Sequence, residues 1–291
     1  MKLKLCLLLI WALGVPWVAR AQEGSAQLMR ATHASLQAQL GNNQFNQPVV
    51  LVSAETPDAL KGDIYAVINY SMAAVKAGLN NPARWCDVML LHINTKYCHA
   101  QTGSAATRLS VNLGSKKPEE LSDATRVDFD YRVLAATPDY LAIGLDAKEG
   151  PMGTSNFRIQ FEALALPDGK SFIHMGYSYR MNFAAQLAMS TYLGTVASGK
   201  VGFTVLEQQA NGQNQYIGGM RGLVERNTMR YYLAINAYLE AATAAPGAQF
   251  ERRLQNWFTA VEQYPRQLHE MDRQEYLAMK RAENQRQLSM P

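Results

Sequence analysis

The sequence lacks the local motifs of the common catalytic sites. It contains no Gly-x-Ser-x-Gly nucleophile elbow, no Walker loop and no His-Glu-x-x-His pair. Its five histidines are scattered, and none has a serine or an aspartate at a spacing that indicates a catalytic pair. These absences remove the sharpest enzymatic hypotheses, although catalytic groups can still converge in space from distant positions. We expect no metal and no cofactor.

Excess charge and long apolar runs are also scarce. The chain has 28 basic and 24 acidic residues. Three of the basic residues, Lys2, Lys4 and Arg20, precede position 22, so the rest of the chain carries 25 basic against 24 acidic residues. This near-neutral balance removes the electrostatic support for a nucleic-acid partner. Beyond position 21, no segment approaches the roughly 18 consecutive apolar residues of a membrane-spanning helix.

The N-terminus has the pattern of a secretory signal peptide. Lys2 and Lys4 precede an apolar run over 5–18, and Ala19-Arg20-Ala21 forms a small-x-small cleavage site. We expect a signal peptide over residues 1–21 with cleavage before Gln22. An uncleaved signal anchor is the alternative. In a Gram-negative host, the mature protein would then be periplasmic.

The mature chain would keep two of the three cysteines, Cys86 and Cys98. In an oxidising compartment, an even pair at short separation is most simply a disulfide. It would join a helix to the strand that follows it. The alternative is a metal site formed by both cysteines with His92 and His99, but these spacings fit no standard zinc pattern.

The first part of the chain predicts two short helices between strands. Residues 22–48 form an N-terminal extension, loosely docked, with a short helix over Ala26–Leu40. Ser71 is a natural N-cap for a helix that reaches Leu79. A second helix begins near Pro82, since proline is favoured in the first helical turn, and it carries Trp85 and Cys86.

The middle of the chain alternates apolar and polar residues with period two, which is typical of antiparallel strands with one buried face. Pro138-Asp139 and Pro167-Asp168-Gly169 supply turns between consecutive segments. We expect a sheet of seven or eight strands. The predicted strands are 49–55, 62–70, one ending at Cys98, 107–113, 127–135, 141–147, 157–163 and 171–183, with shorter candidates at 200–206 and 213–217.

The character of the sequence changes at Gly222. Residues 223–243 contain neither glycine nor proline and predict the longest helix of the chain. Pro246-Gly247 breaks this helix, and residues 249–288 are helical again, with an interruption at Pro265. An apolar stripe through Leu254, Trp257, Phe258 and Val261 either packs back on the domain or binds a partner helix or a membrane surface.

This order of elements resembles the START-like, or polyketide-cyclase-like, superfamily with its helix-grip fold. The resemblance is carried by GDIYAVINYSMAAVKAGLNNPARWCDV and GGMRGLVERNTMRYYLAINAYL, and covers residues 59–242. It implies an α+β fold in which a curved antiparallel sheet grips a long C-terminal helix and encloses a cavity. We therefore divide the chain into a signal peptide (1–21), an N-terminal extension (22–48), a helix-grip domain (49–245) and a C-terminal helical extension (246–291).

The resemblance also implies candidate ligand-binding residues. Met175, Tyr177 and Tyr179 would face the long helix, either as plain core packing or as the lining of a cavity for an apolar ligand. Asn227 and Arg230 lie near the start of that helix. In one interpretation, Arg226 and Arg230 lie on a solvated face, and Glu225 is favoured by its place near the helix N-terminus. In the other, Asn227 or Arg230 binds an acidic head group. Two further candidates are Trp85 and Tyr131. The alternative for Trp85 is a buried core residue that anchors the two short helices.

Three functions remain open from the sequence. The first is a carrier that binds a hydrophobic small molecule, such as a lipid, and makes no bond. The second is a periplasmic accessory or scaffold protein with a filled core, which binds a protein partner or a membrane surface through its C-terminal helices. The third is an enzyme acting on an apolar substrate in the same cavity. We expect the first rather than the third.

Overall fold

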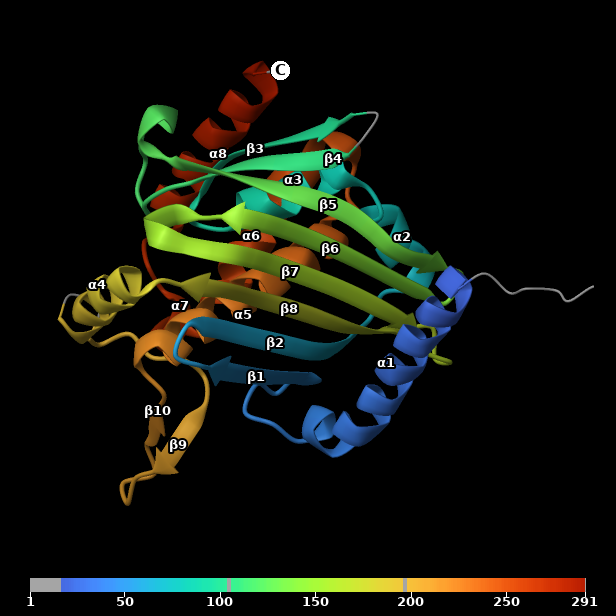
Figure 1. Cartoon of the computed structure of the whole chain (residues 1–291), viewed down its shortest axis with the longest axis horizontal. Helices are drawn as coiled ribbons and strands as arrows, with labels where there is room; N and C mark the ends of the chain where they lie inside the picture. The colour runs from blue at the N-terminus through green and yellow to red at the C-terminus, as the bar shows by residue number, and fades with distance from the viewer. Residues whose placement is uncertain (1–16, 104–105, 196–197, 291) are drawn as a thin grey trace, which may run out of the picture.

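The computed structural model describes residues 17–103, 106–195 and 198–290 (Figure 1). Residues 1–16 of the predicted signal peptide lie outside the described residues. Within the described ranges, no helix is long and apolar enough to cross a membrane.

A curved sheet of eight antiparallel strands forms the centre of the molecule (Figure 1). The strand order is β1-β2-β8-β7-β6-β5-β4-β3, so every neighbouring pair except β2 and β8 is consecutive in the chain. Alternate residues of most strands face the core, as the period-two pattern predicted, but a bulge between Val133 and Ala135 breaks the alternation in β5 and leaves Val133 exposed. The strands are β1 Val49–Glu55, β2 Ala59–Ile68, β3 Thr95–Thr102, β4 Thr107–Leu113, β5 Thr125–Thr137, β6 Tyr140–Glu149, β7 Thr154–Ala165 and β8 Ser171–Met181.

The long helix α5 (Gly219–Ala241) lies in the curve of the sheet. Every residue from Val224 to Leu239 is buried except Asn227 and Asn236, which are half-buried. The helix approaches β2 closely at Gly62, where an added Cβ would lie 2.2 Å from the Thr228 hydroxyl oxygen. The predicted helix-grip architecture, in which a curved antiparallel sheet grips a long helix, is thus confirmed.

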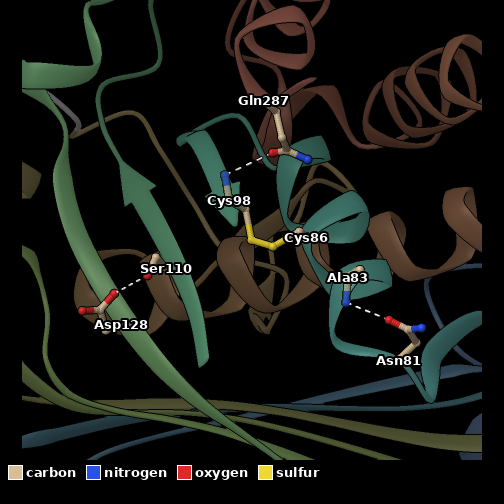
Figure 2. The surroundings of a disulfide bond; sticks show 7 residues. All are labelled: Asn81, Ala83, Cys86, Cys98, Ser110, Asp128 and Gln287. Atoms are coloured by element: carbon tan, nitrogen blue, oxygen red, sulfur yellow. Dashed lines mark hydrogen bonds between the residues drawn. A yellow bond between two sulfur atoms is a disulfide. The ribbon is translucent and has the colours of Figure 1, made fainter. Parts of the chain in front are cut away.

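Two short helices lie between β2 and β3, and a disulfide joins the second of them to β3 (Figure 2). Helix α2 (Met72–Leu79) is capped by Ser71, and α3 (Pro82–Leu91) by Asn81, whose side chain accepts the Ala83 N–H at 2.9 Å. The disulfide between Cys86 and Cys98 joins α3 to β3, as predicted. It fixes the helix and the strand that border the connection at residues 92–94.

Helix α1 (Trp17–Gly41) is longer than the predicted 26–40 and packs on the opposite face of the sheet. Met29 and Leu40 are buried there against the outward residues Tyr140 and Phe172. Arg30 also forms an ion pair with Asp139. The helix is therefore docked, and our expectation of loose docking was wrong.

The segment after β8 differs from the prediction. The strand ends at Met181, and Asn182 caps an unpredicted helix, α4 (Phe183–Gly194), by accepting the Ala185 N–H at 2.8 Å. Phe183 therefore lies exposed on a helix rather than on the inner face of a strand. Helix formers such as Ala184, Ala185, Leu187 and Ala188 explain the change.

The last two predicted strands do not join the main sheet. Strands β9 (Val205–Gln208) and β10 (Asn214–Tyr216) form a separate two-stranded ladder. All residues of β9 are exposed. Without a buried face, this ladder has no apolar contact that would hold it on the main sheet.

The C-terminal helices pack back on the domain, which was one of the two interpretations. They are α6 (Gln249–Val261), α7 (Pro265–Leu268) and α8 (Arg273–Ser289). The stripe through Leu254, Trp257, Phe258 and Val261 is buried, and the Trp257 indole N–H donates to the Arg230 carbonyl at 3.2 Å. The exposed apolar stripe that a partner or a membrane would need is therefore not present on α6.

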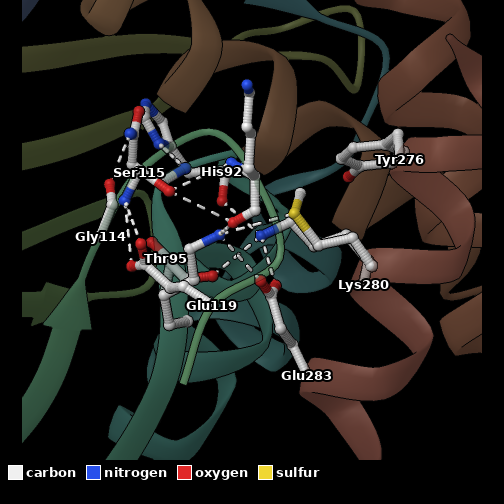
Figure 3. A network of polar contacts seen from close by, with 12 residues as sticks. His92, Thr95, Gly114, Ser115, Glu119, Tyr276, Lys280 and Glu283 are labelled. Carbon is white, nitrogen blue, oxygen red and sulfur yellow. Dashed lines mark hydrogen bonds and ion pairs between the residues drawn. The ribbon is translucent and has the colours of Figure 1, made fainter. Parts of the chain in front are cut away.

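A buried polar network ties α8 to β3 (Figure 3). Glu283 accepts from both Lys96 and Lys280, at 3.1 and 2.8 Å. The Lys280 ammonium also donates to the carbonyls of His92 and Thr95. Burial lowers the pKa of Lys280 to about 8. Glu283 acts to raise this pKa, and the positive charge of Lys96 acts to lower it.

We predict that the double substitution Cys86→Ala/Cys98→Ala lowers the free energy of unfolding by about 3 kcal/mol, because the open chain regains loop entropy. Urea unfolding measures the change. Reductant should destabilise the wild-type protein by a similar amount and leave the double variant unaffected. Equal unfolding curves for the wild-type protein with and without reductant would contradict the prediction.

Candidate functional site

A pocket of about 510 Å³ opens between the first half of α5 and the inner face of the sheet. Its walls come from β7, β8 and α5, from the 92–94 connection and the loop after β4, and from the short turn η2 (Pro151–Gly153). Met189 of α4 contributes one further side chain. A volume of this size lies in the usual range for sites that bind small organic molecules.

Sequence spacing places the lining residues on common faces. Tyr177, Tyr179 and Met181 alternate along β8, so all three point to the inner face of the sheet. Leu223, Asn227 and Tyr231 are four residues apart along α5 and therefore form one stripe of that helix. The pocket lies where these two rows face each other.

Five rings form a continuous wall of the pocket. His92 stacks on Tyr231 with ring centroids 4.6 Å apart, and Tyr231 lies 5.4 Å from Tyr177. Tyr177 and Tyr179 are 5.6 Å apart, and Tyr179 stacks on Phe157 at 5.0 Å. The wall thus changes from polar rings at His92 to a purely apolar ring at Phe157.

The three tyrosine hydroxyls of this wall have no hydrogen-bond partner among the described residues. Burial raises the pKa of Tyr177 and Tyr179, and of Tyr231 as well. The hydroxyls are therefore neutral at physiological pH and can donate. A hydroxyl in a roomy polar site finds its partner in water or in a ligand.

His92 is buried and also lines the pocket. Its Nδ1 accepts the backbone N–H of Asn94 at 3.3 Å, while its Nε2 has no partner among the described residues. Burial lowers the pKa of His92 well below its usual value, and the charges of Arg230, Lys280 and Lys116 lower it further. The ring is therefore neutral, and with Nδ1 accepting, the proton is assigned to Nε2.

The structure brings only some of the predicted ligand-binding residues to the pocket. Tyr177, Tyr179 and Asn227 line it. Met175 is fully buried in the core, away from the lining. Trp85 is also a core residue, and its indole N–H donates to the Leu79 carbonyl at 2.8 Å.

Tyr131 and Arg230 are buried outside the lining as well. Burial raises the pKa of Tyr131 to about 12, and its hydroxyl has no partner among the described residues. Arg230 forms an ion pair with Glu270 at 2.7 Å and donates to the Asn227 side-chain oxygen at 3.4 Å. A ligand role for either residue remains a prediction.

The expectation of a solvated face at the start of α5 was wrong. Glu225 is fully buried and accepts the N–H groups of Phe203 and Thr204 at 2.6 and 2.9 Å. Arg226 donates to the Val201 carbonyl at 3.1 Å, and burial lowers its pKa to about 10. The segment before β9 folds over the helix, a contact that helical periodicity does not contain.

Sequence reasoning missed Phe157, Tyr231 and His92 as pocket residues. Tyr231 follows Asn227 by four positions, a signal that could have been used. However, α5 is buried on all sides, so an apolar stripe alone does not indicate which side faces the cavity. His92 was considered only as a metal ligand, and that alternative site loses both sulfur ligands to the disulfide.

A second cluster of titratable groups lies on the outer face of the sheet. His174 contacts Asp63 through Nε2 and Glu162 through Nδ1, both at 2.8 Å, and stacks on Tyr65. Glu162 also accepts from the Tyr140 hydroxyl. Burial alone would lower the pKa of His174, but the two carboxylates outweigh it and raise this pKa. Among the described residues, no group of His, Cys, Asp and Glu is arranged to hold a metal.

No protein-family model and no curated protein matches the sequence. Solved structures align with the chain at low identity. Human StAR-related lipid transfer protein 5 matches 84% of this chain and 99% of its own, with 9% identity and a TM-score of 0.31. Norcoclaurine synthase from Thalictrum flavum matches 52% of this chain and 81% of its own, with 9% identity and a TM-score of 0.33.

A conserved protein of unknown function from Enterococcus faecalis matches 82% of this chain and 98% of its own, with 9% identity and a TM-score of 0.36. At these scores the alignments give no argument about what the chain binds. The sheet order and the enclosed helix of the chain itself define its architecture.

We predict that the contribution of His174 to stability falls as the pH rises. The pKa of His174 is higher in the folded protein than the value of about 6.5 in the unfolded chain. The protonated ring therefore stabilises the fold fully below about pH 6.5, and this stabilisation is lost as the pH rises through the folded-state pKa. The stability difference between the wild-type protein and His174→Gln should shrink by roughly 1.5–3 kcal/mol between pH 5 and pH 9. Urea unfolding across this range measures it.

The exposed His269 provides the matched control, since His269→Gln should show a much smaller pH-dependent difference. A stability difference for His174→Gln that stays constant from pH 5 to pH 9 would contradict the prediction.

Proposed function

We propose that this chain is exported to the periplasm, where it binds or carries a hydrophobic small molecule in the pocket between α5 and the sheet. The observation that carries the proposal is the ring wall from His92 to Phe157, which combines apolar surface with unpartnered donors. Apolar area removed from water would supply the affinity, at roughly 25 cal/mol per Å². The polar groups would orient the ligand.

Capture and release fits the lining better than catalysis. A general base works best with a pKa near the operating pH, whereas the pKa of His92 lies well below its usual value. The tyrosine hydroxyls, with raised pKa values, remain neutral donors. These groups can hold a ligand without making or breaking a bond.

The scaffold alternative has less support. It relies on an exposed apolar stripe on the C-terminal helices, and the stripe at Trp257 is buried within the chain. Leu288 at the C-terminal end of α8 and Met290 just after the helix are exposed, but these two side chains form no extended stripe.

The first test is native mass spectrometry of the mature protein purified from its own periplasm, followed by solvent extraction of the sample. A stoichiometric apolar adduct is the expected result, and it would identify the ligand class. A bare mass, together with no binding of the fluorescent fatty acid cis-parinaric acid, would contradict the proposal.

A pocket-filling variant tests the location. We predict that Leu223→Trp lowers the affinity for cis-parinaric acid at least tenfold, because the indole occupies space beside Asn227 in the lining. The control is Leu288→Trp, at a position that is 79% exposed on α8, which should leave the affinity unchanged. Equal affinities for the two variants would place the ligand elsewhere.

A further inference from the structure

We propose that the ligand carries an acidic head group, which accepts hydrogen bonds from His92 Nε2–H and from the hydroxyls of Tyr231 and Tyr177, while its apolar part lies along Tyr179 and Phe157. This inference rests on the proposed function, because it assigns the chemistry and the orientation of the molecule held in the same pocket.

The polar groups at the His92 end are hydrogen-bond donors that lack acceptors. His92 Nδ1 is already occupied by the Asn94 N–H, so the neutral ring presents its other nitrogen as N–H, and that nitrogen is unpartnered within the described chain. The hydroxyls of Tyr231 and Tyr177 belong to adjacent rings of the same wall. An ionised acid only accepts hydrogen bonds, at about four lone-pair sites for a carboxylate, so it matches a set of donors.

Cations outnumber acids behind this end of the pocket. Glu270 is shared by Arg230, Lys116 and Lys200, at 2.7, 2.7 and 3.3 Å. Glu283 is shared by two more cations, Lys96 and Lys280, at 3.1 and 2.8 Å. Five positive charges on two carboxylates leave an excess that favours a negative group nearby.

Two acids also line the pocket and oppose this excess. Both oxygens of Glu119 accept the Ser115 N–H, at 3.0 and 3.1 Å, and Asp123 is exposed to solvent. The charges that act on the His92 ring itself are all positive, from Arg230, Lys280 and Lys116. The His92 end therefore favours an anion, and a cationic head group bound by Glu119 and Asp123 is the competing arrangement.

The opposite end of the wall suits an apolar tail. Phe157 has no polar atom in its side chain, and Met152, Met181 and Met189 lie among the lining residues. Flexible methionines adapt to chains of different shape. A pocket of about 510 Å³ lies in the range of sites that hold one small organic molecule, so single-chain ligands are used in the test.

Four ligands with a chain of ten carbons separate the head groups. We expect decanoate or decyl phosphate to bind the mature protein at least tenfold more tightly than decanol, as measured by calorimetry. The ligand of these two that binds more tightly indicates whether the head group is a carboxylate or a phosphate. Equal or tighter binding of decanol or decyltrimethylammonium overturns the acidic head group while leaving the proposed function intact. Failure of all four to bind, together with no binding of cis-parinaric acid, overturns both.

Two variants locate the head group. His92→Asn keeps an oxygen that can accept the Asn94 N–H but removes Nε2–H, and Tyr231→Phe removes only a hydroxyl. Each should weaken decanoate binding about tenfold and change decanol binding less than twofold, because decanol carries no charge for these donors.

The controls are His269→Asn and Tyr192→Phe, at exposed positions outside the pocket. Both should bind decanoate as the wild-type protein does. Urea unfolding and decanol binding verify that the pocket variants fold. Equal losses for decanoate and decanol in His92→Asn would indicate a purely structural role for His92 and overturn the assigned orientation.

Discussion

Helix α5 is enclosed almost completely, so its polar side chains must find partners within the protein. Burying a charged group without a partner costs several kcal/mol, yet this helix carries Glu225, Arg226 and Arg230 in its first half. Glu225 and Arg226 find their partners in the backbone of residues 201–204, and Arg230 finds its partner in Glu270. The surrounding segments are thereby fixed in position relative to the helix.

The pocket follows from this enclosure. Near Asn227 and Tyr231, one side of α5 is separated from the strands by a space lined with large rings, although Thr228 of the same turn lies close to Gly62 of β2. The space is large enough for a small organic molecule. The same helix thus provides both the core of the domain and one wall of the site.

The C-terminal helices contribute to the site from behind. Glu270 and Lys280 follow the end of α5 by 29 and 39 residues, yet they reach the surroundings of His92 through Arg230 and the 92–95 backbone. Buried polar networks of this kind add specificity of position more than net stability. Their presence behind the pocket links the helical extension to the chemistry of the lining, and gives it a role that does not require an external partner.

The sequence by itself determined the local structure: strands with period two such as 157–163, a cap at Ser71, a helix start near Pro82, and a disulfide between Cys86 and Cys98. These features depend on neighbours in the chain or on a single short loop. It also placed Tyr177 and Tyr179 on an inward face. Tertiary structure alone decided that Arg230 pairs with Glu270, that His92 lines a pocket, and that residues after Met181 form α4. Those outcomes depend on contacts between distant segments and on the enclosure of α5, which local periodicity does not encode.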